Sequence, residues 1–263
     1  MTTAHDEALS RAAALLRAAR RVLFITGAGI SADSGLPTYR GVSGLYNGEL
    51  TEDGLPIEDA LSGQCFAERP EITWKYLAQI EHNCRDARPN AAHRVIVEAE
   101  RRGIACIVLT QNVDGLHRQA GTRRLIEIHG TLSPLLCPAC GAAYPGEELD
   151  ALGQPPCCRA CGTVVRPPIV LFGEALPIGA VEALQDELEQ GFDLLFVIGT
   201  TAVFPYIVEP VVMALRSGVP VIEINPAQTQ LSPHVDLHLP LGAAEALRAI
   251  ALQLGWRDPV APV

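Results

Sequence analysis

Four cysteines stand in two C-x-x-C pairs, a pattern from which tetrahedral metal sites are built. Cys137 and Cys140 form the first pair, Cys158 and Cys161 form the second, and seventeen residues separate the pairs. Each C-x-x-C turn can offer two thiolates to one metal ion, and this spacing is that of a structural zinc ribbon. Four thiolates leave no open coordination position, so we expect one zinc ion with a role in folding and none in catalysis.

The alternative is that these cysteines are free or redox-active thiols. Gly141 and Gly162 follow the two pairs directly, which favours the tight turns of a zinc site, and no thioredoxin-like context surrounds the pairs. Cys157 is a neighbouring thiol that could compete for the metal. The C-x-x-C spacing favours Cys158.

A glycine-rich segment follows a short apolar run and could hold phosphate groups. Residues 22–26 are Val-Leu-Phe-Ile-Thr, and Gly27 and Gly29 come directly afterwards. Backbone N–H groups at the end of a buried parallel strand bind the phosphates of dinucleotides. The segment departs from the common G-x-G-x-x-G pattern, because Ala32 takes the place of the third glycine. By itself it is equally consistent with a turn of purely structural role.

Polar residues follow two further apolar runs. Gln111, Asn112 and Asp114 come after residues 105–110, and His129 comes after residues 125–128. At the carboxyl ends of parallel strands such side chains face the ligand crevice. Asn112 and Asp114 could equally cap the following helix, and a lone histidine is usually a structural residue. If the histidine is catalytic, its unperturbed pKa of about 6.5 suits proton transfer near neutrality.

Taken together, these motifs resemble those of the sirtuins, the NAD-dependent protein lysine deacylases. The segment from Gly27 to Gly41 continues as Ser-x-x-Ser-Gly-x-Pro-x-aromatic-Arg-Gly, and residues 111–117 are similar to the family motif Gln-Asn-x-Asp-x-Leu-His. The resemblance runs in order along the chain from about Arg20 to Leu254. Departures from the family pattern are Tyr39 where many members have Phe, Val113 for Ile, and Thr200-Thr201 where serines are common.

The resemblance implies a role for each motif. His129 is implied as the general base, and Asn112 as the second catalytic residue, in a pocket for nicotinamide and its ribose. The implied NAD contacts are Gly27, Ala28, Gly29, Ile30, Ser31, Asp33, Ser34, Tyr39, Arg40, Gln111, Asn112, Val113, Asp114, His129, Gly199, Thr200, Thr201, Asn225 and Pro226. Residues 166–174 resemble an edge strand that accepts the acylated peptide by strand addition. The implied peptide contacts are Val170, Phe172, Gly173, Glu174 and Val203.

The implied reaction removes an acyl group from a protein lysine. The acyl oxygen attacks the nicotinamide-bearing ribose carbon of NAD, nicotinamide leaves, and His129 acts as base on the ribose hydroxyls. The products are free lysine, nicotinamide and O-acyl-ADP-ribose. One alternative is an NAD-dependent protein mono-ADP-ribosyltransferase that uses the same site. Another is a non-catalytic nucleotide-binding or nucleic-acid-binding module, against which the intact His129-Gly130 pair counts.

The acyl preference can also be predicted by resemblance. Members that remove succinyl or malonyl groups are similar to one another in a Tyr-x-x-Arg pair, whose guanidinium can bind the acyl carboxylate. Alignment places Leu77 and Ile80 at those positions here. Tyr76 lies one residue early, and Gln79 at its i+3 position offers no cation. We therefore expect acetyl or longer aliphatic acyl-lysine to be preferred over succinyl-lysine.

The elements that position these residues alternate along the chain. We expect strands at residues 22–26, 105–110, 124–128, 193–198 and 219–224, and helices at residues 6–21, 90–102, 180–189, 207–216 and 243–254. Continuous apolar strands separated by helices are typical of a parallel sheet. The expected fold class is α/β, a Rossmann-like parallel sheet with helices on both faces, plus a small domain made of a helical insert and a zinc ribbon.

Two stretches that lack this alternation define the small domain. Residues 42–87 hold no convincing strand, and residues 135–165 hold the four cysteines. We assign residues 1–41, 88–134 and 166–263 to the NAD-binding domain, and residues 42–87 and 135–165 to the small domain.

Composition limits the possible partners. The 263 residues carry a net charge of −10, which argues against nucleic acid as a partner. No apolar run reaches the ~18 residues that a membrane span requires. No secretory signal is visible, so we expect a cytoplasmic protein whose cysteines are thiols or metal ligands. The sequence leaves the protein substrates and the oligomeric state open.

Overall fold

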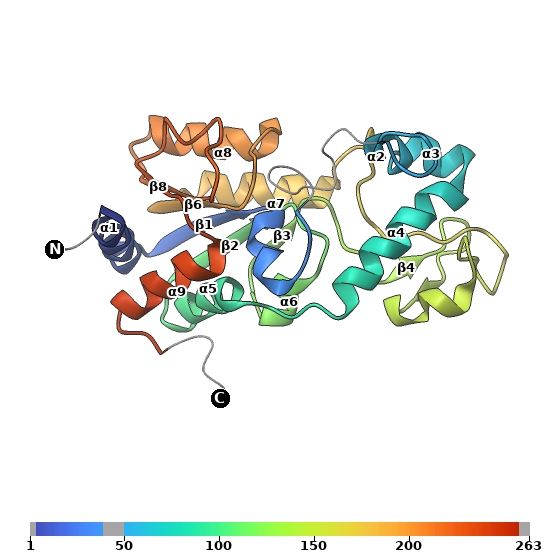
Figure 1. Ribbon diagram of the computed structural model, residues 1–263, viewed down its shortest axis with the longest axis horizontal. Coiled ribbons are helices and arrows are strands. Elements are labelled where there is room, and N and C mark those ends of the chain that lie inside the picture. Colours follow the sequence, from blue (N-terminus) through green and yellow to red (C-terminus); the bar gives the residue numbers. More distant parts are fainter. Residues whose placement is uncertain (1–3, 39–49, 258–263) are drawn as a thin grey trace.

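The computed structural model describes residues 4–38 and 50–257. Within them, six parallel strands form one sheet in the order β3-β2-β1-β6-β7-β8 (Figure 1). The strands are β1 (Arg21–Thr26), β2 (Ala105–Thr110), β3 (Leu125–Glu127), β6 (Leu194–Ile198), β7 (Val221–Ile224) and β8 (Leu237–Leu239). The strand order reverses between β1 and β6, so the loops after these two strands flank the crevice where ligands of such sheets bind.

Helices cover both faces of the sheet because side chains of each strand alternate between them. Val22 and Phe24 of β1 pack in one core cluster with α1 (Ala4–Ala18), α5 (Ala91–Arg101) and α9 (Ala243–Gln253). Leu23 and Ile25 pack in another cluster with α7 (Ile178–Glu189) and α8 (Pro205–Arg216). The predicted α/β class with a parallel sheet is confirmed.

A smaller unit lies beside one end of the sheet (Figure 1). It consists of α2 (Ile57–Ala60), α3 (Gly63–Glu68), α4 (Pro70–Arg85), the antiparallel strands β4 (Leu135–Leu136) and β5 (Ala143–Tyr144), and the 3-10 helix η2 (Gly146–Leu152). One apolar cluster joins α4 to the strands. Trp74 of α4 is 1% exposed, and its Nε1 donates to the carbonyl of Val165 at 2.9 Å. The helical insert and the cysteine-containing module therefore share one core.

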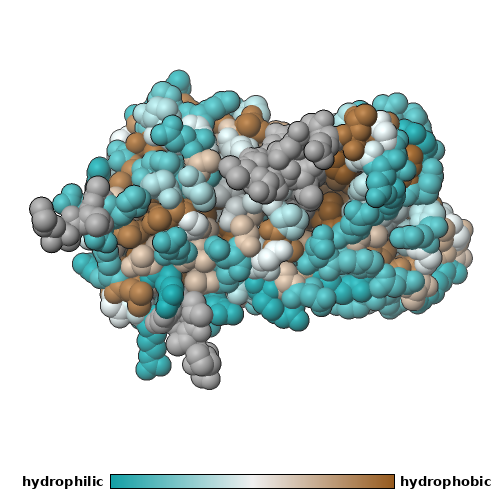
Figure 2. All heavy atoms as spheres, viewed as in Figure 1, coloured by the Kyte–Doolittle hydropathy of each residue, from teal (hydrophilic) through white to brown (hydrophobic). Residues whose placement is uncertain are grey.

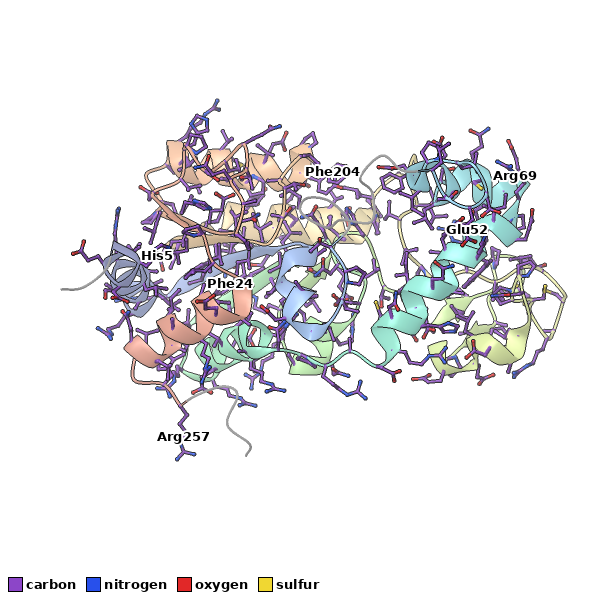
Figure 3. All side chains as sticks on the ribbon, viewed as in Figure 1. His5, Phe24, Glu52, Arg69, Phe204 and Arg257 are labelled. Atoms are coloured by element: carbon purple, nitrogen blue, oxygen red, sulfur yellow. The ribbon has the colours of Figure 1, made fainter. Side chains whose placement is uncertain are left out.

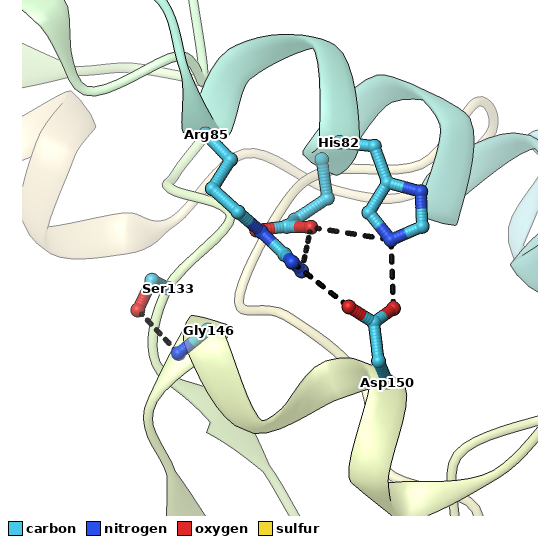
Figure 4. Close-up of polar contacts among 6 residues, drawn as sticks. His82, Arg85, Ser133, Gly146 and Asp150 are labelled. Atoms are coloured by element: carbon cyan, nitrogen blue, oxygen red, sulfur yellow. Dashed lines mark hydrogen bonds and ion pairs between the residues drawn. The ribbon is translucent and has the colours of Figure 1, made fainter.

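Polar contacts add a second link between α4 and η2 (Figure 4). The carboxylate of Asp150 pairs with Arg85 at 2.8 Å and with Nε2 of His82 at 2.8 Å, while the N–H of Gly146 donates to Ser133 Oγ at 3.1 Å. The Asp150 side chain is 57% exposed, and ion pairs this accessible to water contribute little. The apolar cluster is thus the main source of cohesion between these parts.

Most predicted elements occur within a few residues of their expected ends. The first helix is shorter than predicted and ends at Ala18, because the strand that follows begins at Arg21. Strand β8 was not predicted, since Leu-His-Leu is too short to show a pattern, and its pairing with β7 is what makes it a strand. No described helix is sufficiently long and apolar to cross a membrane.

Candidate functional site

The loops that follow β1 and β6 touch through their glycines. The N–H of Gly29 donates to the carbonyl of Gly199 at 2.8 Å. A Cβ on Gly29 would lie 2.5 Å from Cα of Gly199, and Gly199 itself has a φ of +58°. Among the described residues, the N–H groups of Ala28 and Thr200 have no acceptor. The close approach of the two backbones and the N–H groups of Ala28 and Thr200 suit the binding of dinucleotide phosphates at these strand ends.

The polar motif after β2 lies against this glycine loop. Asn112 is 7% exposed, and its Nδ2 donates to the carbonyl of Gly27 at 3.1 Å and to Ser31 Oγ at 3.2 Å. Ser31 Oγ donates to Asp114 Oδ2 at 2.7 Å, and burial raises the pKa of Asp114. Asp114 Oδ1 also accepts from the N–H of Leu116 at 2.9 Å, where α6 (Leu116–Ala120) begins. Asp114 therefore makes the helix-start contact and faces the loop as well.

A pocket opens where the two motifs meet helix α4. It is lined by Ala28, Ser31, Leu36, Pro37, Ile80, Asn83, Cys84, Asn112, Val113 and Asp114. Asn83 and Cys84 were not predicted as site residues. They follow Ile80 at the i+3 and i+4 spacing of one helix face, so the helical pattern alone could have placed them together.

His129 has both ring nitrogens in hydrogen bonds. Nδ1 lies 2.9 Å from the carbonyl oxygen of Gln111, and Nε2 lies 2.7 Å from the hydroxyl of Tyr206. A carbonyl can only accept, so Nδ1 carries the proton, and Nε2 of the neutral ring accepts from the tyrosine. Burial lowers the pKa of His129 and favours this neutral form. Tyr206 was not predicted, because it lies 77 residues away on α8.

Thr200 connects two other predicted residues. Its Oγ1 accepts from Gln111 Nε2 at 2.7 Å, and its carbonyl accepts from Asn225 Nδ2 at 3.1 Å. The loops after β2, β6 and β7 are thereby held together at the carboxyl edge of the sheet. Thr201 lies half-buried in this edge, and Pro226 is exposed.

Two predicted contacts of the first loop are engaged within the fold. Asp33 Oδ2 accepts from the N–H of Ala244 at 3.2 Å, in the first turn of α9, and Ser34 Oγ accepts from Asn90 Nδ2 at 3.0 Å. Asn90, which was not predicted, also donates to the carbonyl of Ile30 at 2.7 Å. The Ile30 side chain is fully buried in the core beneath. The remaining predicted residues of this loop, Tyr39 and Arg40, lie outside the described residues.

The predicted peptide-binding segment bridges the two parts of the molecule. The N–H of Val170 donates to the carbonyl of His129 at 2.9 Å, and the N–H of Phe172 donates to Leu61 at 3.0 Å. Among the described residues, the carbonyl of Val170 and the N–H of Gly173 have no backbone partner. These groups are suited to strand addition.

The predicted peptide contacts Glu174 and Val203 differ in their partners: Glu174 is ion-paired, whereas Val203 is exposed. Glu174 pairs with Arg166 at 2.7 and 2.9 Å and accepts from the N–H of Leu171 at 2.9 Å, so its carboxylate braces the turn. The guanidinium lowers the pKa of Glu174. Val203 is 43% exposed, and the adjacent Phe204 lies at the end of the sheet unit that faces the small unit (Figure 3). Figure 2 shows apolar surface gathered at this junction of the two units.

The four predicted cysteines converge. Their Sγ atoms all lie within 4.8 Å of one another, with 3.5 Å between Cys137 and Cys161 and 3.6 Å between Cys140 and Cys158. Four sulfurs at ~2.3 Å from a tetrahedral zinc ion are about 3.8 Å apart, so the donor set fits that metal. Cys157 lies outside the cluster, and its thiol donates to the carbonyl of Pro155. The predicted four-cysteine cluster is confirmed.

Beneath the site, two buried histidines meet. His117 is the last residue of the Asn112 motif, and its Nε2 lies 3.0 Å from Thr26 Oγ1. The hydroxyl of Thr26 donates to Thr110 Oγ1 at 2.9 Å. Thr110 Oγ1 in turn accepts from the N–H of Asn112 at 3.1 Å. His93 packs on His117 with 4.8 Å between ring centroids. These contacts connect the core to the backbone of the site.

Comparisons with known proteins agree with this geometry. Residues 27–205 match the sequence profile of the Sir2 family. NAD-dependent protein deacylase 2 of Pseudomonas aeruginosa is 55% identical over 234 residues, which cover 88% of this chain and 91% of that protein. An NAD-dependent protein deacylase of Thermus thermophilus is 40% identical over 249 residues, which cover 92% and 93% of the two chains.

Solved structures agree as well. One described as "Structural Basis for the Mechanism and Regulation of Sir2 Enzymes" matches with a TM-score of 0.84 and 33% identity, covering 95% of this chain and 98% of that one. A complex described as Sir2 with p53 peptide and NAD+ matches with a TM-score of 0.81 and 28% identity, covering 93% and 98%. Both the sequence and the fold of this chain thus lead to one assignment: it belongs to the Sir2 family, the sirtuins, which are NAD-dependent protein deacylases.

Proposed function

We propose that this deacylase removes neutral acyl groups, acetyl or longer aliphatic chains, from lysine side chains of proteins, and that His129 is its general base. The observation that carries the acyl preference is the apolar wall that Ile80 contributes to the pocket beside Asn112. The products would be free lysine, nicotinamide and O-acyl-ADP-ribose. A solved Sir2 structure with a TM-score of 0.85 is described with deacetylated p53 peptide and 3′-O-acetyl ADP ribose, in line with this product.

The tautomer of His129 supports its role as base. Its Nδ1–H is fixed by the carbonyl of Gln111, which leaves the lone pair on Nε2. Because burial lowers its pKa, the ring is neutral at physiological pH and able to accept a proton at Nε2.

The chain's own contribution to the chemistry is then positioning. NAD supplies an electrophilic ribose carbon, nicotinamide as leaving group and the ribose hydroxyls. The contact between Gly29 and Gly199 leaves backbone N–H groups that would bind the phosphates, and Asn112 lies beside this loop. The free backbone groups of residues 170–173 would hold the acylated peptide. Fixing both reactants in this way converts an encounter into an oriented reaction.

The electrostatics of the pocket argue against an acidic acyl chain. None of the described residues that line it is Arg or Lys, and Asp114 places a partly buried carboxyl group in the pocket. Leu77 is 2% exposed within the core of the small unit. The hydroxyl of Tyr76 donates to Asp53 at 2.5 Å. Tyr76 therefore does not replace the tyrosine of the Tyr-x-x-Arg pair, although it lies only one residue before that position. A succinyl carboxylate would therefore be desolvated without a cationic partner.

The test compares kcat/KM for acetyl, myristoyl and succinyl versions of one peptide, with and without NAD. We expect acetyl or myristoyl to exceed succinyl, and a succinyl advantage of tenfold or more would overturn the proposal. An Ile80→Arg variant, which places a guanidinium in the pocket wall, should gain succinyl activity. Gln79→Arg is the matched control, because it adds the same charge at an exposed position of the same helix.

We also propose the two-domain division given by the sequence, with residues 1–41, 88–134 and 166–263 in the NAD-binding domain and residues 42–87 and 135–165 in the small domain. The apolar cluster shared by α4 and the cysteine module supports it. The boundary at residues 41 and 42 lies outside the described residues. None of the eight cysteines, all of which lie in the described part of the chain, forms a disulfide, which agrees with a cytoplasmic, reducing location.

A further inference from the structure

Tyr206 is in contact with the one atom of His129 that can act as a base. The Nδ1–H of His129 is donated to Gln111, so the neutral ring has a single acceptor, Nε2. The Tyr206 hydroxyl lies 2.7 Å from this atom and must donate to it. The lone pair that would accept the substrate proton is therefore in a hydrogen bond with Tyr206.

The surrounding aromatic rings hold this contact in place. Phe204 and Tyr206 stack with 5.4 Å between centroids and 9° between planes. The imidazole of His129 meets both rings edge-on, at 87° and 85°. The adjacent Ile207 is fully buried, whereas Tyr206 is only half-buried. Ile207 and other buried residues anchor α8, so the phenol hydroxyl has a contact that core packing does not require.

We propose that Tyr206 is a positioning residue that occupies the place of the ribose hydroxyl on His129 until NAD binds. Its hydroxyl holds the imidazole in the Nδ1–H tautomer and in one orientation. Before His129 accepts a proton from a ribose hydroxyl, Tyr206 must release Nε2, so binding exchanges one hydrogen bond for another. This inference depends on the proposed role of His129 as base.

Tyr206→Phe tests the exchange, because it removes the hydroxyl and keeps the stacked ring. In the variant, binding forms the hydrogen bond between the ribose hydroxyl and Nε2 of His129 and breaks no hydrogen bond to Tyr206. One net hydrogen bond corresponds to about 2- to 10-fold in affinity. We therefore expect ADP-ribose, measured by titration calorimetry, to bind the variant about 2- to 10-fold more tightly than the wild type.

The His129→Ala background is the control for this effect. If Tyr206 acts through His129, adding Tyr206→Phe to His129→Ala should leave ADP-ribose affinity unchanged. Equal gains in both backgrounds, or no gain in the wild-type background, would overturn the proposal. Deacylation by His129→Ala tests the base assignment separately, because retained turnover there would reject the role of His129 whatever the affinities show.

Nitrogen NMR of the histidines gives a readout that requires no variant to fold. In the wild type without ligand, we expect the Nε2 resonance of His129 to show an acceptor hydrogen-bonded to the phenol. On addition of ADP-ribose, the coupling of this nitrogen to the Tyr206 hydroxyl should disappear. Persistence of that hydrogen bond in the saturated complex would contradict the exchange.

Discussion

Replacing His93 with glutamine should make the fold less sensitive to acid. The His93 side chain is fully buried in α5, its Nε2 has no partner among the described residues, and its ring packs on that of His117. Burial lowers its pKa to about 4. The folded protein therefore keeps the ring neutral at a pH where the unfolded chain, with a pKa of about 6.5, already binds a proton.

The sign and size of the effect follow from this difference. Because the unfolded state binds more protons below pH 6.5, stability falls as the pH falls from about 6.5 towards about 4. Between pH 7.5 and 5.0 the two pKa values imply a loss of about 2 kcal/mol from His93 alone. Burial also holds the pKa of His117 well below its usual value, so this ring too lowers the free energy of unfolding as the pH falls.

Glutamine is the informative replacement, because it is uncharged at every pH and suits the same position. His93 is the third residue of α5, and its Nδ1 accepts from the N–H of Asn90 in a capping box. Glutamine at this position makes the same contact. Its packing cost is the same at both pH values and cancels in the comparison.

The measurement is the free energy of unfolding in urea at pH 7.5 and at pH 5.0, for the wild type and His93→Gln. The wild type should lose about 2 kcal/mol more than the variant between the two pH values. If both proteins lose the same amount within about 0.5 kcal/mol, the buried neutral histidine is not a source of acid sensitivity, and the reasoning is wrong.

Two further predictions concern the base and the metal. His129→Ala should fold and bind NAD but lose deacylation of an acylated peptide; near-normal turnover by the folded variant would remove His129 from the mechanism. Cys137→Ser should lower the zinc content, determined by metal analysis, to near zero and lower the melting temperature with it, because the module has little core of its own. One equivalent of tightly bound zinc retained by a Cys137 and Cys158 double variant would refute the four-thiolate site.

Local patterns were sufficient for much of the fold. Strand β2 was predicted to the residue at 105–110, because a buried parallel strand is a continuous apolar run between a glycine turn and polar residues. The cysteine cluster was equally accessible, since two C-x-x-C turns fix the ligands by spacing alone. The short strand β8 could not be predicted in this way, because it is a strand only through its pairing with β7 at the edge of the sheet.

The site divides in the same way. The sequence by itself determined which polar residues end the strands, because the carboxyl edge of a parallel sheet collects whatever follows each strand. Only the tertiary structure decided which unpredicted side chains meet them from elsewhere, such as Tyr206 on His129 and Asn90 beneath the first loop. These partners are far apart in the chain, and no periodicity links them. Their contacts exist only once α8 and α5 have packed around the sheet.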